Sequence, residues 1–418
     1  MTSFSSVIKF NFQEGAASTS HYYSDINECR VDVFDSITDV PLDKWENCIE
    51  MDDLFLSKKY LSVVERSALP GMKVRYVILS YDDSVKAILY FQVINLSDAG
   101  LGGILNLEEY GGLAATISTR INDLLFSPSG EKSSFLLVCG NLLLSGDHGI
   151  RAVDDEAYSK AVQCISGIKK LINESLGNNA RIVAYMVKDF YEKEDKLAGP
   201  ALKKDYFLLN TDPEMIFEIR PQWSNFEDYL SSLSSKYRLR ANNVKAKLGN
   251  VIIRDLSLEE IIDAESALFS FNEQVIRKAP VKLVKPSSAY FVNLKRTFGD
   301  NYNIKAFILN NEIIAFTSAL WNKKHFEAHY IGIDYSLNSE YSLYQNILYS
   351  YINDAITCKS KQLFFGRTAL EIKSTTGAKP HTLSCYFRFA NRVISTLAKP
   401  LVSSTGPRSW IPRDPFKN

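Results

Sequence analysis

Hydrophobic residues first recur with strand-like spacing between residues 74 and 93. The apolar stretches 74–79 and 85–93 are separated by the polar pair Asp82–Asp83, which is typical of a tight turn. This pattern predicts a β-hairpin. Residues 97–133 are rich in Gly and Ser and have weak periodicity, so we interpret them as a long insertion or an active-site loop.

The next stretch combines a strand period with a helix period. An apolar run over 135–144 predicts a strand, a turn with glycines follows, and Asp154–Asp155 is typical of a helix start. Apolar positions then recur with a helical period up to Gly177, which suits a helix C-terminus, before residues 181–187 return to strand character. The sequence therefore predicts a β-loop-α-β unit.

A similar unit recurs in the second half of the chain. An apolar strand over 325–333 precedes a loop, a helix with one apolar face over 343–355, and a strand over 362–365. The two copies share few letters, but the same order of elements indicates an architectural duplication. We expect an α/β fold class in which each half has a mixed sheet and a crossover helix.

The segment between the copies contains helix-start signals. Ser224 and Glu227 match a capping box and predict a long helix that ends at Gly249. A second capping box, Ser257 with Glu260, predicts another helix that reaches about Asn272. A hairpin over 304–320 follows, turning at Asn310–Asn311.

These patterns divide the 418 residues into two domains. We predict a first domain over 20–220, a second over 221–400 and a C-terminal tail over 401–418. Two domains of roughly 200 residues each also agree with the size at which single hydrophobic cores stop growing.

Composition narrows the function classes. Forty-eight basic and forty-eight acidic residues cancel, so no whole-molecule field attracts nucleic acid or anionic lipid. The apolar runs are too short for a membrane-spanning helix, and the first residues lack a secretion signal, so we expect a cytoplasmic protein. The five histidines lack zinc-site spacing and no G-x-S-x-G elbow occurs, so we expect neither a metal nor a serine nucleophile.

Several segments together carry a family resemblance. The basic segment 234–253, Tyr330-Ile-Gly-Ile, the helix 343–355, the strand Leu363-Phe-Phe-Gly-Arg and Ile372-Lys-Ser-Thr-Thr-Gly follow one another in order. This ordered set resembles the second domain of FemABX-type transferases and their BioF-like relatives, over roughly residues 220–395. The first half is similar in layout alone.

The resemblance implies a fold of two GNAT-like domains in tandem. It also implies transfer of an acyl or aminoacyl group from a carrier, such as acyl-CoA, acyl carrier protein or aminoacyl-tRNA, onto an amine. We expect acyl-CoA as a co-substrate, no tightly bound cofactor, and a small amine acceptor. An aminoacyl-tRNA-dependent transferase and a non-catalytic GNAT-like binding protein are the alternatives. The oligomeric state stays open.

Candidate proton-handling groups lie near the end of the strand 325–333. His325, Glu327 and His329 alternate, which predicts one shared face, so Glu327 or His329 can serve the attacking amine. A solvated strand face is the alternative. Tyr330 and Asp334 are candidates as acid and as amine-orienting group, or as structural residues.

A second set of candidates follows the strand at 362–365. By resemblance, Lys373, four residues before Gly377, contacts substrate phosphate or carbonyl groups, and its charge can stabilise an oxyanion. Arg367, directly after Gly366, can bind phosphate or carboxylate. The alternative for Lys373 is an ordinary surface lysine.

Phosphate-binding candidates come from both halves. Gly140, Gly146 and Gly149 precede a helix, so their amides can cradle a pyrophosphate, or they form a flexible turn. The corresponding loop of the second half, 334–342, has no glycine, which leaves the donor open. The basic helix over 236–247 can face a tRNA or CoA phosphate, or be a solvated face.

Overall fold

The computed structural model describes residues 9–11, 21–50, 53–67, 69–96, 133–278, 284–404 and 409–417. The predicted loop at 97–133 therefore lies, except for its last residue, outside the described residues. The chain forms two compact units. One comprises residues 1–211 and 383–407, and the other comprises residues 212–382 and 408–418.

The first unit is built on a ten-stranded mixed sheet. Nine strands lie in the order β1 (Lys9–Asn11), β2 (His21–Ile26), β3 (Cys29–Phe34), β4 (Met72–Tyr81), β5 (Ser84–Asn95), β6 (Ser133–Cys139), β8 (Ala180–Phe190), β17 (Ser384–Phe389) and β9 (Phe207–Leu209). The short β7 (Ile150–Ala152) pairs with β5. The β4–β5 hairpin turns at Asp82 and Asp83, both with positive φ, as predicted.

Helices pack on both faces of this sheet because its strands alternate between two apolar layers. On β4, Tyr76 packs edge-on against Trp45 of α1 (Leu42–Glu46), with ring centroids 5.6 Å apart. The neighbouring Val77 joins the core that contains Ile165 of α4 (Asp155–Ser175). The other helices are α2 (Lys58–Arg66), α5 (Glu192–Leu202) and α14 (Arg392–Ser404).

The second unit has a seven-stranded mixed sheet. Its order is β11 (Ile252–Asp255), β12 (Tyr302–Leu309), β13 (Glu312–Trp321), β14 (His325–Ile333), β15 (Gln362–Phe364), β10 (Glu214–Glu218) and β16 (Lys379–His381). The hairpin turn at Asn310–Asn311 is confirmed, and both residues have positive φ.

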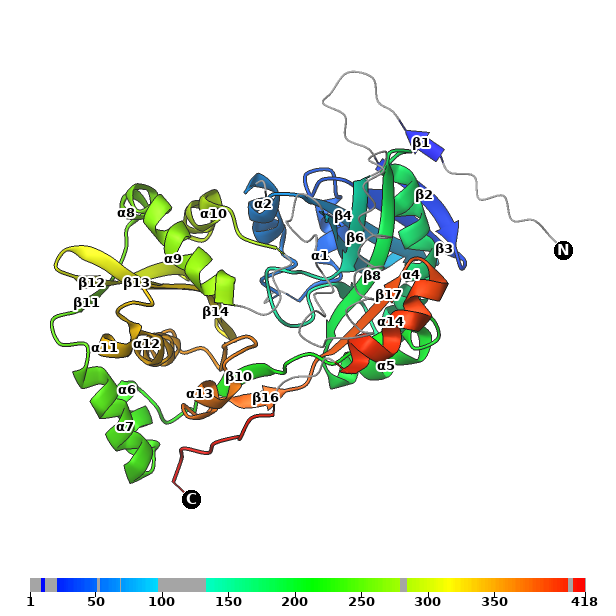
Figure 1. Ribbon diagram of the computed structural model, residues 1–418. Coiled ribbons are helices and arrows are strands. Elements are labelled where there is room, and N and C mark those ends of the chain that lie inside the picture. Colours follow the sequence, from blue (N-terminus) through cyan, green and yellow to red (C-terminus); the bar gives the residue numbers. More distant parts are fainter. Residues whose placement is uncertain are drawn as a thin grey trace. The chain divides into compact units, whose positions relative to one another are not determined.

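Helices cover both faces of the second sheet (Figure 1). Helices α9 (Glu265–Lys278) and α10 (Ser288–Phe298) pack on one face, and α12 (Leu343–Thr357) packs on the other. The remaining helices are α6 (Phe226–Ser232), α7 (Ser235–Ala246), α8 (Leu258–Asp263), α11 (Asn338–Tyr341), the short 3-10 turn Gly299–Asn301 and α13 (Leu370–Ser374).

The predicted duplication is visible in the strand pairing. Within the described residues, the parallel pairs are β6 with β8, on either side of α4, and β14 with β15, on either side of α12. Every other pair among the described strands is antiparallel. The α/β fold class with two mixed sheets is thus confirmed.

The single long helix predicted over 224–249 is wrong. The capping box is formed by Asn225 and Asp228, and the helix divides into α6 and α7 at Leu233. Leu233 has an extended backbone and forms an isolated bridge with Phe416. Because Phe416 lies far along the chain, the local apolar period contains no sign of this break.

Two further differences concern element ends. The capping box of Ser257 and Glu260 is confirmed, but its helix α8 ends at Asp263 and a second helix, α9, follows. The strand predicted over 135–144 ends at Cys139.

The domain boundary also differs from the prediction. Residues 383–407, most of which were predicted to lie in the second domain, belong to the first unit, where β17 lies between β8 and β9.

Candidate active site

Strand β14 departs from regular pairing on both of its edges. Opposite β13, Ala328 pairs with Ala319 and Tyr330 pairs with Ser318, so His329 is an extra residue, a β-bulge. On the other edge, β15 pairs with β14 over His325 to Glu327 alone. Beyond Glu327 the two strands are not paired in the part of the chain that the structure describes. Bulges and strand ends of this kind re-aim side chains at functional sites.

Glu327 is a buried carboxyl at this point. Its side chain is 5% exposed, and its Oε2 lies 3.0 Å from Nε2 of His325. The His325 ring stacks on Phe364 of β15 at a centroid distance of 3.8 Å. Burial raises the pKa of Glu327 well above its ordinary value, while the charge of Lys373 opposes that rise. Of the face predicted for His325, Glu327 and His329, the contact between His325 and Glu327 is confirmed, whereas His329 lies in the bulge and contacts Tyr290.

The bulge brings two consecutive rings against one helix residue. Nε2 of His329 lies 2.8 Å from the hydroxyl of Tyr290 on α10, and the Tyr330 ring packs edge-on against the same Tyr290, with centroids 6.2 Å apart. Simple alternation would separate His329 and Tyr330 onto opposite faces. Both side chains are half-buried, which leaves part of each accessible.

The two rings differ in their acid–base character. Burial lowers the pKa of His329 to about 3, so its imidazole is neutral near pH 7. Burial, and then the charge of Glu327, raise the pKa of Tyr330, so its phenol stays protonated. A neutral phenol can donate a proton, whereas an imidazole with so low a pKa is a weak proton acceptor.

Lys373 on α13 lies in the same region but is fully occupied. Its Nζ donates to the carbonyl oxygens of Phe365, Gly366 and Arg367 at 2.8, 3.2 and 2.6 Å. An ammonium has three N–H groups, so these carbonyls use all of them. Burial lowers the pKa of Lys373 to about 7, and Glu214, Asp212 and Glu327 oppose this shift. The contacts make Lys373 a residue that holds the turn after β15, and a substrate contact stays a prediction.

The other predicted residues of this half have mainly local partners. Oδ1 of Asp334 accepts from the amide and hydroxyl of Ser336, at 2.9 and 2.6 Å, and so orders the turn before α11. Gly366 has positive φ and accepts from the amide of Met215. Gly377 also has positive φ, and the Phe416 ring occupies the space where a Cβ would lie. Arg367 is half-buried beside Gly366.

Known proteins match this chain through structure alone. No family model and no curated protein matches the sequence. The crystal structure of FemX superposes with a TM-score of 0.51 at 11% identity, covering 86% of this chain and 98% of that chain. The chain shares the overall fold of FemX. At this identity the likeness concerns the fold.

Two further solved structures are similar at lower scores. A conserved protein of unknown function from Bacteroides thetaiotaomicron matches with a TM-score of 0.46 and 12% identity, over 87% of this chain and 98% of that one. A tandem GNAT protein from the clavulanic acid biosynthesis pathway matches with a TM-score of 0.42 and 6% identity, over 80% and 88%.

In the first unit, two of the predicted phosphate-binding glycines pack against each other. A Cβ on Gly149 would lie 3.0 Å from the amide nitrogen of Gly140, and a Cβ on Gly140 would meet the side chain of Lys188 at 2.5 Å. The Lys188 Nζ donates to the carbonyls of Asn141 and Leu144 at 2.6 and 2.7 Å. These contacts explain the glycines by close packing, and phosphate binding by them stays a prediction.

The helix that follows these glycines begins among acidic groups. Asp154 caps α4 by accepting from the amide of Ala157, and Asp155 and Glu156 occupy the first turn. Strand β7 also separates Gly149 from the helix. Gly146 has positive φ and is buried. Carboxylates in this position disfavour a bound phosphate.

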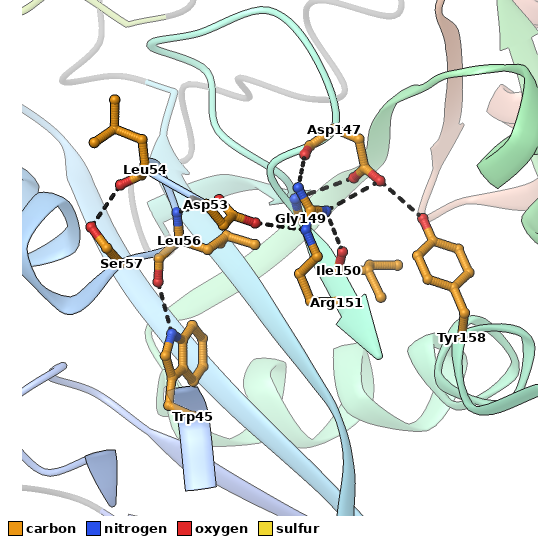
Figure 2. Close-up of polar contacts among 10 residues, drawn as sticks. All are labelled: Trp45, Asp53, Leu54, Leu56, Ser57, Asp147, Gly149, Ile150, Arg151 and Tyr158. Carbon is orange, nitrogen blue, oxygen red and sulfur yellow. Dashed lines mark hydrogen bonds and ion pairs between the residues drawn. The ribbon is translucent and has the colours of Figure 1, made fainter. Parts of the chain in front are cut away.

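The first unit also contains a largely buried charged cluster that the sequence patterns did not predict, shown in Figure 2. Arg151 pairs with Asp53 at 2.7 Å and with Asp147 at 3.4 Å, and the hydroxyl of Tyr158 donates to Asp147 at 3.3 Å. Burial raises the pKa of Asp147 to about 6, against the lowering effect of Arg151. Asp53 lies 98 residues before Arg151, so local spacing offers no signal for this pair.

Two expectations concern binding sites and membranes. Among the described residues, no group of three or more His, Cys, Asp or Glu side chains has a geometry that would hold a metal ion. No helix in the described ranges is both long and apolar enough to cross a membrane.

Proposed function

We propose that the second GNAT-like unit is an N-acyltransferase and that the acyl group reacts with the amine at the point where the pairing of β14 with β15 ends. The observation that supports this most directly is the buried Glu327 carboxyl beside the bulge, with the Tyr330 phenol on the same stretch of strand. The FemX-like fold agrees with a transferase of this general class.

The proposed reaction is a direct attack on a thioester. The amine nitrogen bonds to the carbonyl carbon, the carbon–sulfur bond breaks, the amine loses one proton and the carrier thiolate gains one. Glu327 suits the role of proton acceptor because its raised pKa makes its carboxylate a stronger base than an ordinary carboxylate. Tyr330 suits the role of proton donor because its raised pKa keeps the phenol protonated near neutral pH.

Lys373 and His329 have supporting parts in this proposal. Lys373 holds the turn after β15 and favours the ionised form of Glu327 by its charge. It is therefore a positioning residue. His329 orients Tyr290 and is not the proton acceptor, since its pKa is about 3.

Acyl-CoA is the proposed donor, and transfer from aminoacyl-tRNA is the second candidate, which the basic residues of α7 favour. Both donors carry phosphates and an activated carbonyl. The acceptor in either case is an amine.

The test is an assay of thiol release from acyl-CoA with a panel of amines. We expect Glu327→Gln to lower kcat about a hundredfold or more. In the wild-type protein kcat/KM should rise with pH as Glu327 loses its proton, and this limb should be absent from the variant. The exposed Glu312→Gln, on neighbouring β13, is the matched control and should behave as wild type.

Equal activity of the Glu327 and Glu312 variants would remove Glu327 from the mechanism. Absence of turnover with every acyl-CoA and charged tRNA tried would instead favour the non-catalytic binding protein. Thermal stabilisation by CoA species is an independent readout, because a ligand that binds the folded state raises apparent stability.

A further inference from the structure

Helix α7 carries a concentrated positive charge in a chain without net charge. No acidic residue occurs between residues 229 and 254. Lys245 pairs with Glu227 at 3.4 Å. The other cations of the helix and its C-terminal flank form no ion pair with any residue that the structure describes; they are Lys236, Arg238, Arg240 and Lys247.

Part of this charge forms a single line along the helix. Lys236, Arg240, Asn243 and Lys247 are spaced by four, three and four residues, so they lie on one side of α7. Their side chains are exposed. We call these four residues the α7 stripe. At 1.5 Å per residue the stripe is roughly 16 Å long, which exceeds the size of one phosphate group.

The α7 stripe borders a hollow of about 320 Å³. All four of its residues line this hollow, together with Ser342 and Gln345 at the start of α12. No acidic side chain is among the lining residues. The hollow therefore offers cationic and amide donors without a competing carboxylate.

A second hollow of about 440 Å³ shares Lys236 and Arg240 with the first. Its other charged lining residues are Glu371 and Arg413, which pair with each other at 2.5 Å. Glu371 is thus neutralised by a cation outside the stripe. The positive potential of Lys236 and Arg240 extends over both hollows.

The charges do not stabilise the helix that carries them. Lys236 and Arg240 are like charges at positions i and i+4, a pairing that destabilises a helix. No side chain caps the N-terminus of α7, and the helix buries few apolar residues, namely Ala241 and Val244. A bound anion would relieve this repulsion, whereas packing within the unit gains nothing from it.

We propose that the α7 stripe binds the phosphate groups of the carrier that delivers the acyl group. Identifying the ligand as this carrier rests on the proposed function. Phosphates spaced along a chain fit the stripe, and Arg240 can bind one of them with two parallel hydrogen bonds. These cations then substitute for glycine amides, which the loop 334–342 lacks. Coenzyme A and the phosphodiester chain of an RNA are two sources of such phosphates.

The test compares two triple variants of the full chain with equal loss of charge. The stripe variant is Lys236→Ala, Arg240→Ala and Lys247→Ala. The control variant is Lys170→Ala, Lys193→Ala and Lys196→Ala, which removes exposed lysines from the first unit. Binding of acetyl-CoA is measured by calorimetry, and binding of a short single-stranded RNA by fluorescence anisotropy, each at several salt concentrations. Thermal unfolding verifies that all three proteins are folded.

We expect the wild-type protein to bind one of the two probes, and the probe that binds identifies the source. The affinity of the stripe variant for that probe should fall about tenfold or more. The slope of log K against log salt concentration should become shallower by about one for each phosphate contact that is lost. The control variant should retain wild-type binding. The proposal is wrong if the wild type binds neither probe, if the stripe variant binds as tightly as wild type, or if both variants lose affinity equally.

Turnover separates this proposal from the proposed function. If the stripe variant turns over acyl donor with an unchanged KM for the donor, the stripe fails and the transferase stands. If the stripe variant loses affinity for a probe while the wild type acylates no amine, the stripe stands and the transferase fails.

Discussion

At the scale of single residues, two of the carboxyl groups that the fold buries, Asp147 and Glu327, lie in different settings. Asp147 faces Arg151 and Tyr158 within a network that uses its oxygens, whereas Glu327 has His325 as its near partner and the charge of Lys373 in the background. The first arrangement anchors a loop. The second keeps a carboxyl beside accessible rings, which suits proton transfer better than anchoring.

Asp147 yields a prediction about pH. Its pKa rises from 3.8 to about 6 on folding, so the folded state binds the proton more tightly than the unfolded state does. The contribution of this proton to the free energy of unfolding is therefore lost as pH rises from about 4 to above 6. The shift corresponds to about 3 kcal/mol. In Asp147→Asn this loss disappears, so the free energy of unfolding of the variant, relative to wild type, should increase with pH over this range.

Urea unfolding between pH 4 and pH 7 measures that difference. Asp83→Asn is the control, because Asp83 is an exposed turn residue whose positive φ asparagine tolerates. A difference curve for Asp147→Asn that is as flat as the control curve would show that Asp147 ionises freely in the folded state.

At the scale of elements, the glycine loop after β6 depends on close backbone contact. Gly149→Ala places a methyl carbon 3.0 to 3.2 Å from backbone atoms of Gly140 and Cys139, which cannot move as a side-chain tip can. We expect a loss of about 1–3 kcal/mol in the free energy of unfolding. Gly177→Asn is the control, since a Cβ there meets nothing within 4 Å and asparagine tolerates positive φ. Similar stability of the two variants would mean that the loop adjusts freely.

Elements that depend on local pattern were predictable from the sequence. The hairpin turns at Asp82–Asp83 and Asn310–Asn311 and both helix-flanking parallel strand pairs arise from short-range signals. The break at Leu233 depends on Phe416, and the Arg151–Asp53 pair joins distant segments, so neither leaves a local trace.

In the candidate site too, contacts set by local pattern were predictable and contacts set by distant segments were not. The alternation of residues correctly predicted that His325 and Glu327 lie together. A bulge depends on the partner strand, so the sequence of β14 alone did not predict that His329 and Tyr330 both contact Tyr290. The three carbonyl contacts of Lys373 likewise require the folded turn at Phe365 to Arg367.

At the scale of the whole molecule, one strand of the first unit comes from a segment that follows most of the second unit in the sequence. Strand β17 pairs with β8 and β9, and it follows the whole of the β10–β16 segment along the sequence. Its buried side chains include Tyr386, whose hydroxyl donates to Asp195 of α5 at 2.6 Å. The first unit therefore cannot reach its native sheet until residues near 390 are available.

This dependence predicts the effect of truncation. A chain that ends after Thr382 lacks β17 and α14 of the first unit, and also residues 408–418 of the second unit. The loss of β17 exposes the edge of β8 and removes Tyr386 from the first core. An unpaired edge and a missing core strand favour unfolding and aggregation of that unit. We expect the truncated chain to be largely insoluble or, if soluble, to lose amide protection in β8 in hydrogen exchange. Adding residues 383–404 as a separate peptide should restore part of that protection, because the pairing needs the strand and not its covalent link. If the truncated chain keeps β8 as protected as the full chain does, β17 is dispensable and the first unit is complete without it.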